Sequence, residues 1–265
     1  MVSHLATLLL ALSSISGSTP AAAERPEGLQ LRVVTYNVNF GRAGDMETLA
    51  AIGDAEADLI ALQETNPHWE QEIRRAYGQT YPHMAFFYAG AASGLALLSK
   101  LPFEHEIIEN PGPWFPAMLA VVGTREGPVQ VLNLHLRPPI SDGGSWVSGQ
   151  LTTRTYRRDE AEEFGRRLDP EVPALIVGDF NERSGHAIRY FRSLGARDAV
   201  ADMAGSTHTW RWPLRWITLR KQLDHVLHTE HFVPLDLEVR EVGRSDHLPI
   251  MATFVLVSRE QSAAF

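Results

Sequence analysis

The chain has 265 residues, of which 44% are hydrophobic, and it carries a formal net charge of −8. That much apolar material can bury a core, so a disordered chain is excluded, and the length suits one large domain. The negative charge argues against binding nucleic acid through overall charge, although a local basic groove is still allowed. Because the chain has no cysteine, disulfides and thiolate metal sites are excluded. A bound metal would need oxygen or imidazole ligands, and oxygen-rich sites suit Mg²⁺, Mn²⁺ or Ca²⁺.

The N-terminal segment has the pattern of an export signal. Residues 5–12 form a short apolar run, and mostly small residues follow as far as position 23. The run is too short to span a bilayer and suits a signal peptide over 1–23, with a linker at 24–28. No Lys or Arg precedes the run, so an N-terminal anchor or a misassigned start is the alternative. We expect a periplasmic or secreted protein, without a membrane span in the mature chain.

Short apolar strands alternate with loops and a few helices over residues 29–258, which we interpret as one domain followed by a tail at 259–265. Strands are predicted at 31–38, 58–64, 94–99, 118–123, 129–136, 174–180, 222–228 and 248–256. Helices are predicted at 45–54, 66–77, 152–168 and 185–194, where apolar positions recur three and four residues apart. Gly195 follows the last helix where a C-terminal glycine is expected.

Polar residues lie at the ends of four of these strands. Asn37 and Glu64 end the first and second strands. His135 and Asp179 end the strands at 129–136 and 174–180. Side chains at strand ends sit on a rigid scaffold at the rim of a sheet, where sites are commonly built. Each residue alone is more often an ordinary strand terminus, but the four together indicate a shared site.

Hydrolysis of a phosphoester needs a metal at the phosphate, a base for water and stabilisation of the leaving oxygen. Glu64 is the best candidate for a metal ligand, with a solvated strand end as the alternative. In extended backbone, Asp179 and Asn181 would point to the same side, so that a carboxylate and an amide face one phosphate. The alternative for this segment is an Asx turn that closes the strand.

The segment SDH at 245–247 supplies Asp246 and His247 just before the last strand. Histidine titrates near neutral pH, which makes His247 the candidate base for water. A carboxylate must fix its tautomer, and Asp224 on a neighbouring strand is the candidate. We expect His225, on the opposite face of that strand, to be a packing or surface residue. The other histidines are expected to be structural, His135 excepted.

Six short motifs occur in order along the chain: TYNVN at 35–39, LQE at 62–64, NLHL at 133–136, GDFN at 178–181, LDHVL at 223–227 and SDH at 245–247. With them the chain resembles the endonuclease/exonuclease/phosphatase superfamily, which includes DNase I-like nucleases, sphingomyelinases and inositol-phosphate phosphatases. The resemblance covers essentially the whole predicted domain. It implies an α/β fold of two packed mixed β-sheets flanked by helices, a four-layer α/β/β/α sandwich.

The resemblance also implies roles for the matched residues. Glu64 would be the principal Mg²⁺ ligand, with Asn37 beside it and Asp246 at or just behind the metal. Asp179 and Asn181 would position the nucleophilic water and bind the scissile phosphate.

The same resemblance makes His247 the catalytic histidine, oriented by Asp224, and places His135 at the phosphate or the leaving group. Abasic-site endonucleases of the superfamily usually have an acidic residue where this chain has Asn39 and a tyrosine where it has His135. Both departures look closer to the DNase I, sphingomyelinase and phosphatase branches. A role in DNA repair is therefore not expected.

Two further segments are candidates for contact with the substrate. Arg154 and Arg158 lie one helical turn apart and would either bind the substrate or form a solvated face paired with Glu162 and Glu163. Residues 208–221 interleave tryptophans with arginines and a lysine. That composition suits stacking on bases, sugars or lipid headgroups, and the alternative is a lid whose tryptophans pack on the core.

Three functions follow from these observations. The first is a divalent-metal-dependent phosphodiesterase or phosphatase, in which water attacks a metal-bound phosphate in line. The second is an exported DNase I-like endonuclease that acts on DNA or RNA. The third is a catalytically inactive binding module, which predicts the loss of at least one catalytic residue, whereas every matched position retains usable chemistry. We expect a monomer whose partner is a phosphoester substrate, either a nucleic acid or a lipid headgroup.

Overall fold

The computed structural model describes residues 28–110, 112, 114–139, 149 and 152–257. The predicted signal peptide at 1–23 and the tail at 259–265 lie outside the described residues. Within the described residues, no helix has the length and apolar character needed to cross a bilayer.

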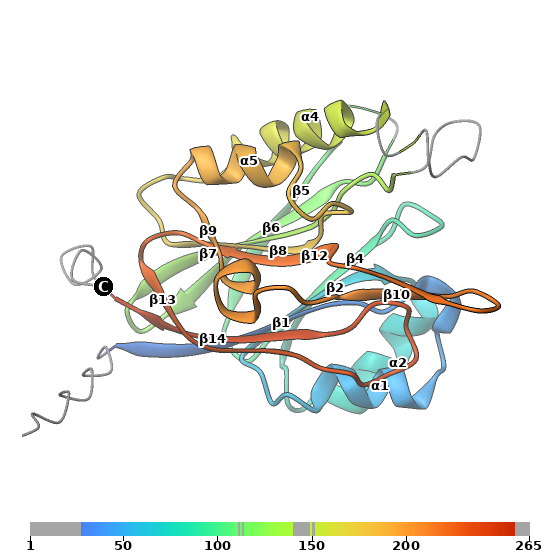
Figure 1. Ribbon diagram of the computed structural model, residues 1–265. Coiled ribbons are helices and arrows are strands. Elements are labelled where there is room, and N and C mark those ends of the chain that lie inside the picture. The colour runs from blue at the N-terminus through green and yellow to red at the C-terminus, as the bar shows by residue number, and fades with distance from the viewer. Residues whose placement is uncertain (1–27, 111, 113, 140–148, 150–151, 258–265) are drawn as a thin grey trace, which may run out of the picture.

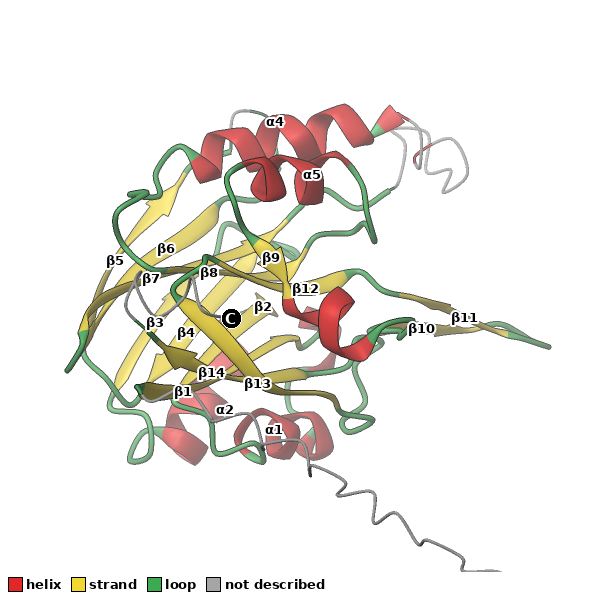
Figure 2. Ribbon diagram, turned by 60° about the vertical axis from the view of Figure 1, so that its left-hand side comes forward, coloured by secondary structure: helices red, strands yellow, loops and turns green. Residues whose placement is uncertain are grey.

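The described chain forms two six-stranded mixed sheets, which pack face to face (Figure 1). The first has the order β13 (Phe232–Val239), β14 (Ile250–Leu256), β1 (Leu29–Asn37), β2 (Leu59–Thr65), β4 (Gly94–Ser99) and β3 (His83–Phe87). The second has the order β5 (Phe103–Ile108), β6 (Ala117–Thr124), β7 (Gly127–His135), β8 (Ala174–Asp179), β12 (Asp224–His228) and β9 (Arg197–Asp198). A separate ribbon of β10 (Trp210–Pro213) and β11 (Thr218–Lys221) projects from the domain (Figure 2).

Helices cover the outer face of each sheet (Figure 1). The first sheet carries α1 (Met46–Gly53) and α2 (Pro67–Tyr77), and the second carries α4 (Arg154–Gly165) and α5 (His186–Ser193). A 3₁₀ helix, η1 (Phe40–Arg42), and a short π-helix, η2 (Val200–Ala204), are also present. The predicted α/β fold of two packed sheets flanked by helices is thus confirmed.

The two helices of the first sheet, α1 and α2, begin at residues whose side chains satisfy a free backbone amide of the first turn. Asp45 accepts a hydrogen bond from Thr48 N at 2.8 Å at the start of α1. Asn66 accepts one from Trp69 N at 2.9 Å at the start of α2, where a proline occupies the first turn. Such side-chain caps fix where each helix leaves the loop, and so fix how its apolar face meets the sheet.

The central strands are buried on both faces, because sheet and helices pack on either side of them. Along β1, Leu31 and Val33 point into the core between the two sheets. Val34 and Tyr36 point to the other face and pack under α1 and α2. This alternation explains why the strands are continuous apolar runs in the sequence.

The strand pairing brings the polar strand ends to one edge. β1 and β2 are parallel, with Asn37 opposite Gln63, and β7 and β8 are parallel, with His135 opposite Asp179. β12 runs antiparallel to β8 and begins where β8 ends, so that Asp224 lies opposite Asp179. Parallel strands end on the same side, which is the geometric reason for a common rim.

Close packing of the second sheet requires glycine at position 178. Its φ is +134°, and a Cβ atom there would lie 2.0 Å from the carbonyl oxygen of Leu134 on the neighbouring strand β7. No side chain fits that contact, and a positive φ is strained for other residues.

Apart from the two-residue β9 and the two strands of the ribbon, three strands escaped prediction, namely β3, β5 and β13. All three lie at sheet edges or end the sheet order, and their residues are largely half-buried or exposed. Edge strands carry fewer apolar and more charged residues, so their pattern is weak. β13 also has an irregular register between Pro234 and Asp236.

A buried amide pair joins the two sheets inside the core. Gln63 Nε2 donates to Asn133 Oδ1 at 2.8 Å. Asn133 Nδ2 donates in turn to the carbonyl oxygens of Leu62 and Ala96, both at 3.0 Å. Both amides are fully buried, so their hydrogen bonds fix the position of β2 against β7 just behind the site.

We predict that Asn133→Ala lowers the free energy of unfolding by about 2–4 kcal/mol, because it removes these hydrogen bonds and leaves buried polar groups unpaired. Urea denaturation followed by circular dichroism measures the change. Gln30→Ala is the control, because the side chain of Gln30 on β1 is exposed. We expect its free energy of unfolding to stay within about 0.5 kcal/mol of the wild-type value. An Asn133 variant as stable as the control would contradict the role of this pair.

Candidate active site

The predicted residues converge at the shared edge of the two sheets. Asn37, Glu64, His135, Asp179 and Asp224 come from the ends of β1, β2, β7 and β8 and the start of β12. Asp246 and His247 reach the same place from the segment before β14, which forms an isolated bridge from His247 to Trp210. Most of these side chains are buried, and those of Glu64 and Asp246 are half-buried. The structure therefore brings together seven of the predicted residues that are far apart in the chain.

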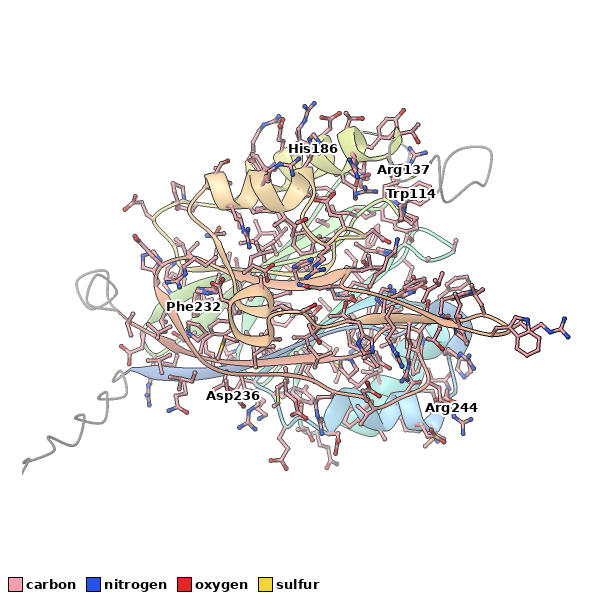
Figure 3. All side chains as sticks on the ribbon, viewed as in Figure 1. Trp114, Arg137, His186, Phe232, Asp236 and Arg244 are labelled. Carbon is pink, nitrogen blue, oxygen red and sulfur yellow. The ribbon has the colours of Figure 1, made fainter. Side chains whose placement is uncertain are left out.

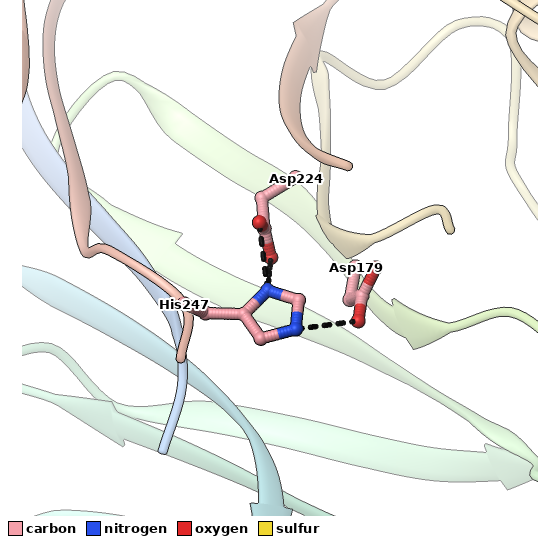
Figure 4. A group of neighbouring side chains, drawn as sticks. All are labelled: Asp179, Asp224 and His247. Atoms are coloured by element: carbon pink, nitrogen blue, oxygen red, sulfur yellow. Dashed lines mark hydrogen bonds and ion pairs between the residues drawn. The ribbon is translucent and has the colours of Figure 1, made fainter. Parts of the chain in front are cut away.

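His247 lies between two carboxylates (Figure 4). Its Nδ1 is 2.9 Å from Asp224 Oδ2, and its Nε2 is 3.5 Å from Asp179 Oδ2. A carboxylate accepts hydrogen bonds, so Nδ1 carries a proton and Nε2 faces Asp179. Burial disfavours the charged ring, but Asp224 and Asp179 outweigh that effect and raise the pKa of His247 to about 10.

A hydroxyl group holds Asp224 in place. Thr209 Oγ1 donates to Asp224 Oδ2 at 2.6 Å and accepts from the backbone amides of Leu223 and Asp224 at 3.0 Å. Ser245 holds the backbone of His247 in place, since its Oγ donates to the carbonyl oxygen of Asn37 and accepts from His247 N at 3.2 Å. These hydrogen bonds fix the orientation of the imidazole.

Asn37 holds the carboxylates of Glu64 and Asp179 side by side. Its Nδ2 donates to Glu64 Oε1 at 3.0 Å and to Asp179 Oδ2 at 3.2 Å. Its Oδ1 accepts from Asn39 N at 3.1 Å. Burial raises the pKa of Glu64, and it raises the pKa of Asp179 to about 6. One neutral amide therefore stands between two acids that lack a full counter-charge.

Glu64 sits on strained backbone. Its φ is +60°, at the point where the pairing of β2 with β4 changes register. Residues other than glycine rarely adopt this conformation, and it is common at functional sites. The second oxygen of Glu64 accepts from Phe40 N at 3.2 Å. This geometry turns the carboxylate away from the sheet and toward the rim.

Asp246 lies behind this cluster and receives two donors. Asn39 Nδ2 donates to its Oδ1 at 2.8 Å, and Trp210 Nε1 donates to its Oδ2 at 2.9 Å. Its negative charge also contributes to the raised pKa of Glu64. Asp246 therefore belongs to the site, and direct contact with a metal stays a prediction.

His135 is buried and neutral. Burial lowers its pKa, and its ring lies 4.9 Å from that of Phe115. Its Nδ1 is 3.3 Å from the carbonyl oxygen of Ala92, which can only accept a hydrogen bond, so Nδ1 carries the proton. Its Nε2 is 3.5 Å from Asp179 Oδ2 and presents a lone pair toward that carboxyl group.

Asn181 departs from the extended backbone predicted for GDFN. Its φ is +52°, and its backbone amide donates to Asp179 Oδ1 at 2.8 Å, which is the Asx turn that stood as the alternative. Its Nδ2 donates to the carbonyl oxygen of Leu136 at 2.9 Å. The turn places Asn181 beside Asp179 all the same, at the rim of a groove.

Beside Asn181 opens a groove of about 610 Å³ between the start of α5 and the base of the ribbon. Its basic lining residues are Arg154, Arg157, Arg183, Arg189, Arg220 and Lys221. His186, at the start of α5, also lines it and is labelled in Figure 3. Most of these residues belong to no recognisable sequence motif. The groove was therefore not predicted from the sequence and is seen only in the fold.

The two predicted substrate arginines differ in position. Arg154 lines the groove. Arg158 is exposed and pairs with Asp159 at 2.8 Å and Glu162 at 3.5 Å, which matches the solvated-face alternative. A substrate role for Arg158 is therefore not supported, whereas one for Arg154 stays a prediction.

A buried ion pair supports the loop that carries Asn181. Glu182 lies 3.0 Å from Arg157 and accepts from the backbone amides of Ala187 and Ile188 at the start of α5. His225 Nε2 donates to the carbonyl oxygen of Glu182 at 2.8 Å, and its Nδ1 is 2.8 Å from Asp198 Oδ2. His225 is therefore a packing residue in the interior and not a surface residue, which were the two placements expected for it.

The donor set suits a hard divalent cation. Asp179, Asp224 and His247 have ligand atoms within 4.8 Å of one another, but Asp224 is already bonded to His247 and Thr209. Glu64, together with Asp179, offers oxygen atoms whose negative charge no described cation balances fully. Oxygen ligands of this kind fit Mg²⁺, Mn²⁺ or Ca²⁺. In this structure Asn37 presents its amide nitrogen, not its oxygen, to the two acids.

Comparison with known proteins agrees with this geometry. Residues 34–247 match the model of the endonuclease/exonuclease/phosphatase family. Among solved structures, an endonuclease/exonuclease/phosphatase from Beutenbergia cavernae is 20% identical, with a TM-score of 0.67 over 86% of this chain and 72% of that one. No curated protein matches.

Two further structures share the fold. TDP2 from D. rerio, solved with a single-strand DNA product, is 18% identical, with a TM-score of 0.64 over 85% of this chain and 98% of that one. An AP endonuclease from Archaeoglobus fulgidus is 18% identical, with a TM-score of 0.62 over 84% of this chain and 99% of that one. At such identities the likeness shows the fold alone. The family match covers most of the chain, and the chain belongs to the endonuclease/exonuclease/phosphatase family, as its motifs predicted.

We predict that Asp224→Asn lowers the pKa of His247, because it removes the carboxylate that most favours the charged ring. The folded pKa of about 10 lies above the ordinary value of 6.5. Protonated His247 therefore stabilises the fold fully below pH 6.5, and that contribution is lost as pH rises toward 10. NMR titration of the imidazole in the presence of a chelator measures the shift, with His105→Gln as a control for assignment. An unchanged His247 pKa would contradict the pairing.

Proposed function

We propose that this member of the endonuclease/exonuclease/phosphatase family is a divalent-metal-dependent hydrolase of phosphoester bonds. The observation that carries the proposal is the chain of contacts from Asp224 through His247 to Asp179, next to Glu64 and Asn37. Such a constellation joins an acid, an oriented imidazole and a cluster of buried oxygen atoms. A binding module would have no need of it.

A divalent cation, Mg²⁺ in the first place with Mn²⁺ or Ca²⁺ as alternatives, would neutralise the phosphate oxygens when bound. Glu64 would be its principal ligand, with Asn37 beside it and Asp246 at or behind it. Support comes from the raised pKa values of Glu64 and Asp179, since buried like charges in contact with one amide favour an added positive charge.

The residues of the chain divide the remaining work. Asp179, with a pKa of about 6, is largely ionised near neutral pH and takes a proton from the attacking water. The lone pair of His135 Nε2 faces Asp179 Oδ2. Once Asp179 has taken up the proton, this lone pair accepts a hydrogen bond from it. We assign the water proton to Asp179 and not to His247, the base predicted from the sequence, because a pKa of about 10 keeps the ring of His247 protonated near neutral pH. The charged ring of His247 instead stabilises the negative charge that grows on the phosphate. Asp224 acts as a positioning residue, since it holds His247 in place.

The bond changes balance in this scheme. The water oxygen forms a bond to phosphorus, and the bond from phosphorus to the leaving oxygen breaks. The water proton passes to Asp179 Oδ2, and the leaving oxygen receives a proton from the imidazolium of His247 or from solvent. Asn181, beside Asp179, orients the water or the phosphate.

We predict that Glu64→Gln and His247→Asn each lower kcat/KM on bis-p-nitrophenyl phosphate by about 10²–10⁴-fold. The assay uses purified protein with Mg²⁺, Mn²⁺ or Ca²⁺, and with a chelator in place of metal. Arg158→Gln is the matched control, because this arginine pairs on the surface of α4, and we expect it to retain full activity. Activity that survives both substitutions would refute the mechanism.

Metal binding can be measured without turnover. We expect millimolar Mg²⁺ or Mn²⁺ to raise the melting temperature of the wild type, because a ligand that binds only the folded state stabilises it. Glu64→Gln should abolish most of this increase, whereas Arg158→Gln should leave it intact. Equal metal stabilisation of wild type and Glu64→Gln would assign the ion to other residues.

A nuclease is the second candidate, and the basic groove beside Asn181 favours it. Cations along a groove bind the successive phosphates of a polymer. The net charge of −8 restricts such attraction to this groove. Plasmid DNA, RNA and sphingomyelin are the substrates that separate the candidates.

We predict that Arg183→Gln with Arg189→Gln lowers kcat/KM on a polyanionic substrate by about tenfold through lost phosphate contacts. The same double variant should leave hydrolysis of bis-p-nitrophenyl phosphate unchanged. Arg166→Gln with Arg167→Gln, two exposed arginines that do not line the groove, is the control. If both double variants behave alike on plasmid DNA and RNA, the nuclease proposal fails.

Export is part of the same proposal, since residues 1–23 have the pattern of a signal peptide. Cell fractionation with an antibody against the chain tests it. A protein found only in the cytoplasm would remove the periplasmic or secreted setting without touching the chemistry of the site.

A further inference from the structure

The ribbon of β10 and β11 exposes an unusual share of apolar surface. Of the eleven large hydrophobic residues exposed in the described chain, five lie in this ribbon: Trp212 (48%), Leu214 (48%), Trp216 (83%), Ile217 (59%) and Leu219 (37%). The tip extends beyond the rest of the domain (Figure 3). The tryptophans therefore do not pack on the core as the lid alternative expected, with the exception of Trp210, which is 8% exposed.

The two faces of the ribbon differ in chemistry. Trp212 pairs with Leu219 across the strands, and Trp210 stacks on Trp212 with ring centroids 6.2 Å apart. Arg211 pairs with Arg220 on the opposite face, because side chains alternate along a strand. One face thus carries Trp212 and Leu219, with Trp210 and Lys221 at its base, and the other face carries Arg211 and Arg220.

The tip between the strands is also apolar and basic. Leu214 N donates to the carbonyl oxygen of Ile217 at 2.7 Å, which closes the turn. The guanidinium of Arg215 lies 4.9 Å above the ring of Trp216. Leu214, Trp216 and Ile217 therefore project together, next to a cation that keeps its charge at the surface.

We propose that this ribbon docks the protein on an anionic lipid surface, with the tip residues in the interfacial layer. Tryptophan is favoured at the boundary of headgroups and acyl chains, and arginine is attracted to anionic headgroups. The aliphatic Leu214 and Ile217 decide against a nucleic acid at the tip, because bases stack on aromatic rings and not on branched alkyl groups. The exposed Arg215 and Arg220 match the negative charge of such lipids.

The base of the ribbon is tied to the site. Trp210 donates to Asp246 at 2.9 Å and forms a β-bridge with His247. The backbone amide of Arg211 also donates to the carbonyl oxygen of Asp246 at 2.8 Å. A surface that holds the tip would therefore hold the edge of the domain that carries the site close to the lipid. Lipid binding itself does not rest on the proposed hydrolysis, and it is measured without turnover.

Vesicle sedimentation of the full chain tests the proposal. The vesicles are phosphatidylcholine alone or phosphatidylcholine mixed with phosphatidylglycerol, and a chelator prevents hydrolysis. We expect the wild type to partition into the anionic vesicles, and Trp216→Ala with Ile217→Ala to reduce its partition coefficient by about tenfold or more. Arg215→Gln with Arg220→Gln should reduce the partition into anionic vesicles alone. Val121→Ala with Leu194→Ala is the matched control, because both residues are exposed outside the ribbon, and it should bind as the wild type does.

Fluorescence gives a second reading that does not depend on sedimentation. The tryptophan emission maximum of the wild type should shift to shorter wavelength when vesicles are added, because Trp216 enters the lipid interface. The Trp216→Phe variant should lose most of that shift. All the variants lie on exposed positions, so equal circular dichroism shows that they fold. No partition of the wild type, equal partition of the tip variant, or self-association that the tip variant abolishes without any vesicle binding would each overturn the proposal.

Discussion

Negative charge held away from water is the constraint on which the structure of the site depends. Glu64, Asp179 and Asp224 lie within one small region at the edge of the two sheets, and burial raises the pKa of the first two. Such groups repel one another and remain together only where donors and rigid backbone hold them. The amide of Asn37 and the ring of His247 supply the donors. The parallel pairing of strands supplies the backbone.

The rest of the fold keeps this region rigid. The amide pair of Gln63 and Asn133 fixes one sheet against the other directly behind it. Thr209 and Ser245 orient the carboxylate and the imidazole. Beyond these, the ion pair of Arg157 and Glu182 supports the loop after β8. Each layer of support is buried, which agrees with the general need for side chains of a site to be locked by their neighbours.

Much of this arrangement follows from the sequence. Apolar periodicity predicted the central strands and the main helices, and the strand-end residues predicted the common rim. Edge strands such as β13 were missed because half-exposed positions mix polar and apolar residues. Thr209 was missed because a lone hydroxyl group has no pattern in a sequence. The turn at Asn181 was predicted only as an alternative, since its positive φ depends on the hydrogen bond to Asp179. Arg154 and Arg158 lie one helical turn apart, yet Arg154 lines the groove and Arg158 forms surface ion pairs. Helical spacing alone does not tell which residues of a helix face meet a groove.

The glycine of the GDFN motif has a different origin from its neighbours. Asp179 and Asn181 are placed by the chemistry of the site, whereas Gly178 is required by the contact of β8 with the carbonyl oxygen of Leu134. The two requirements act independently. A relative that had lost its hydrolytic residues would still need the glycine in order to close the sheet, so the presence of this glycine in a homologous chain indicates the architecture and says nothing about activity. Within this motif the acid and the amide, and not the glycine, carry the chemistry proposed for the site.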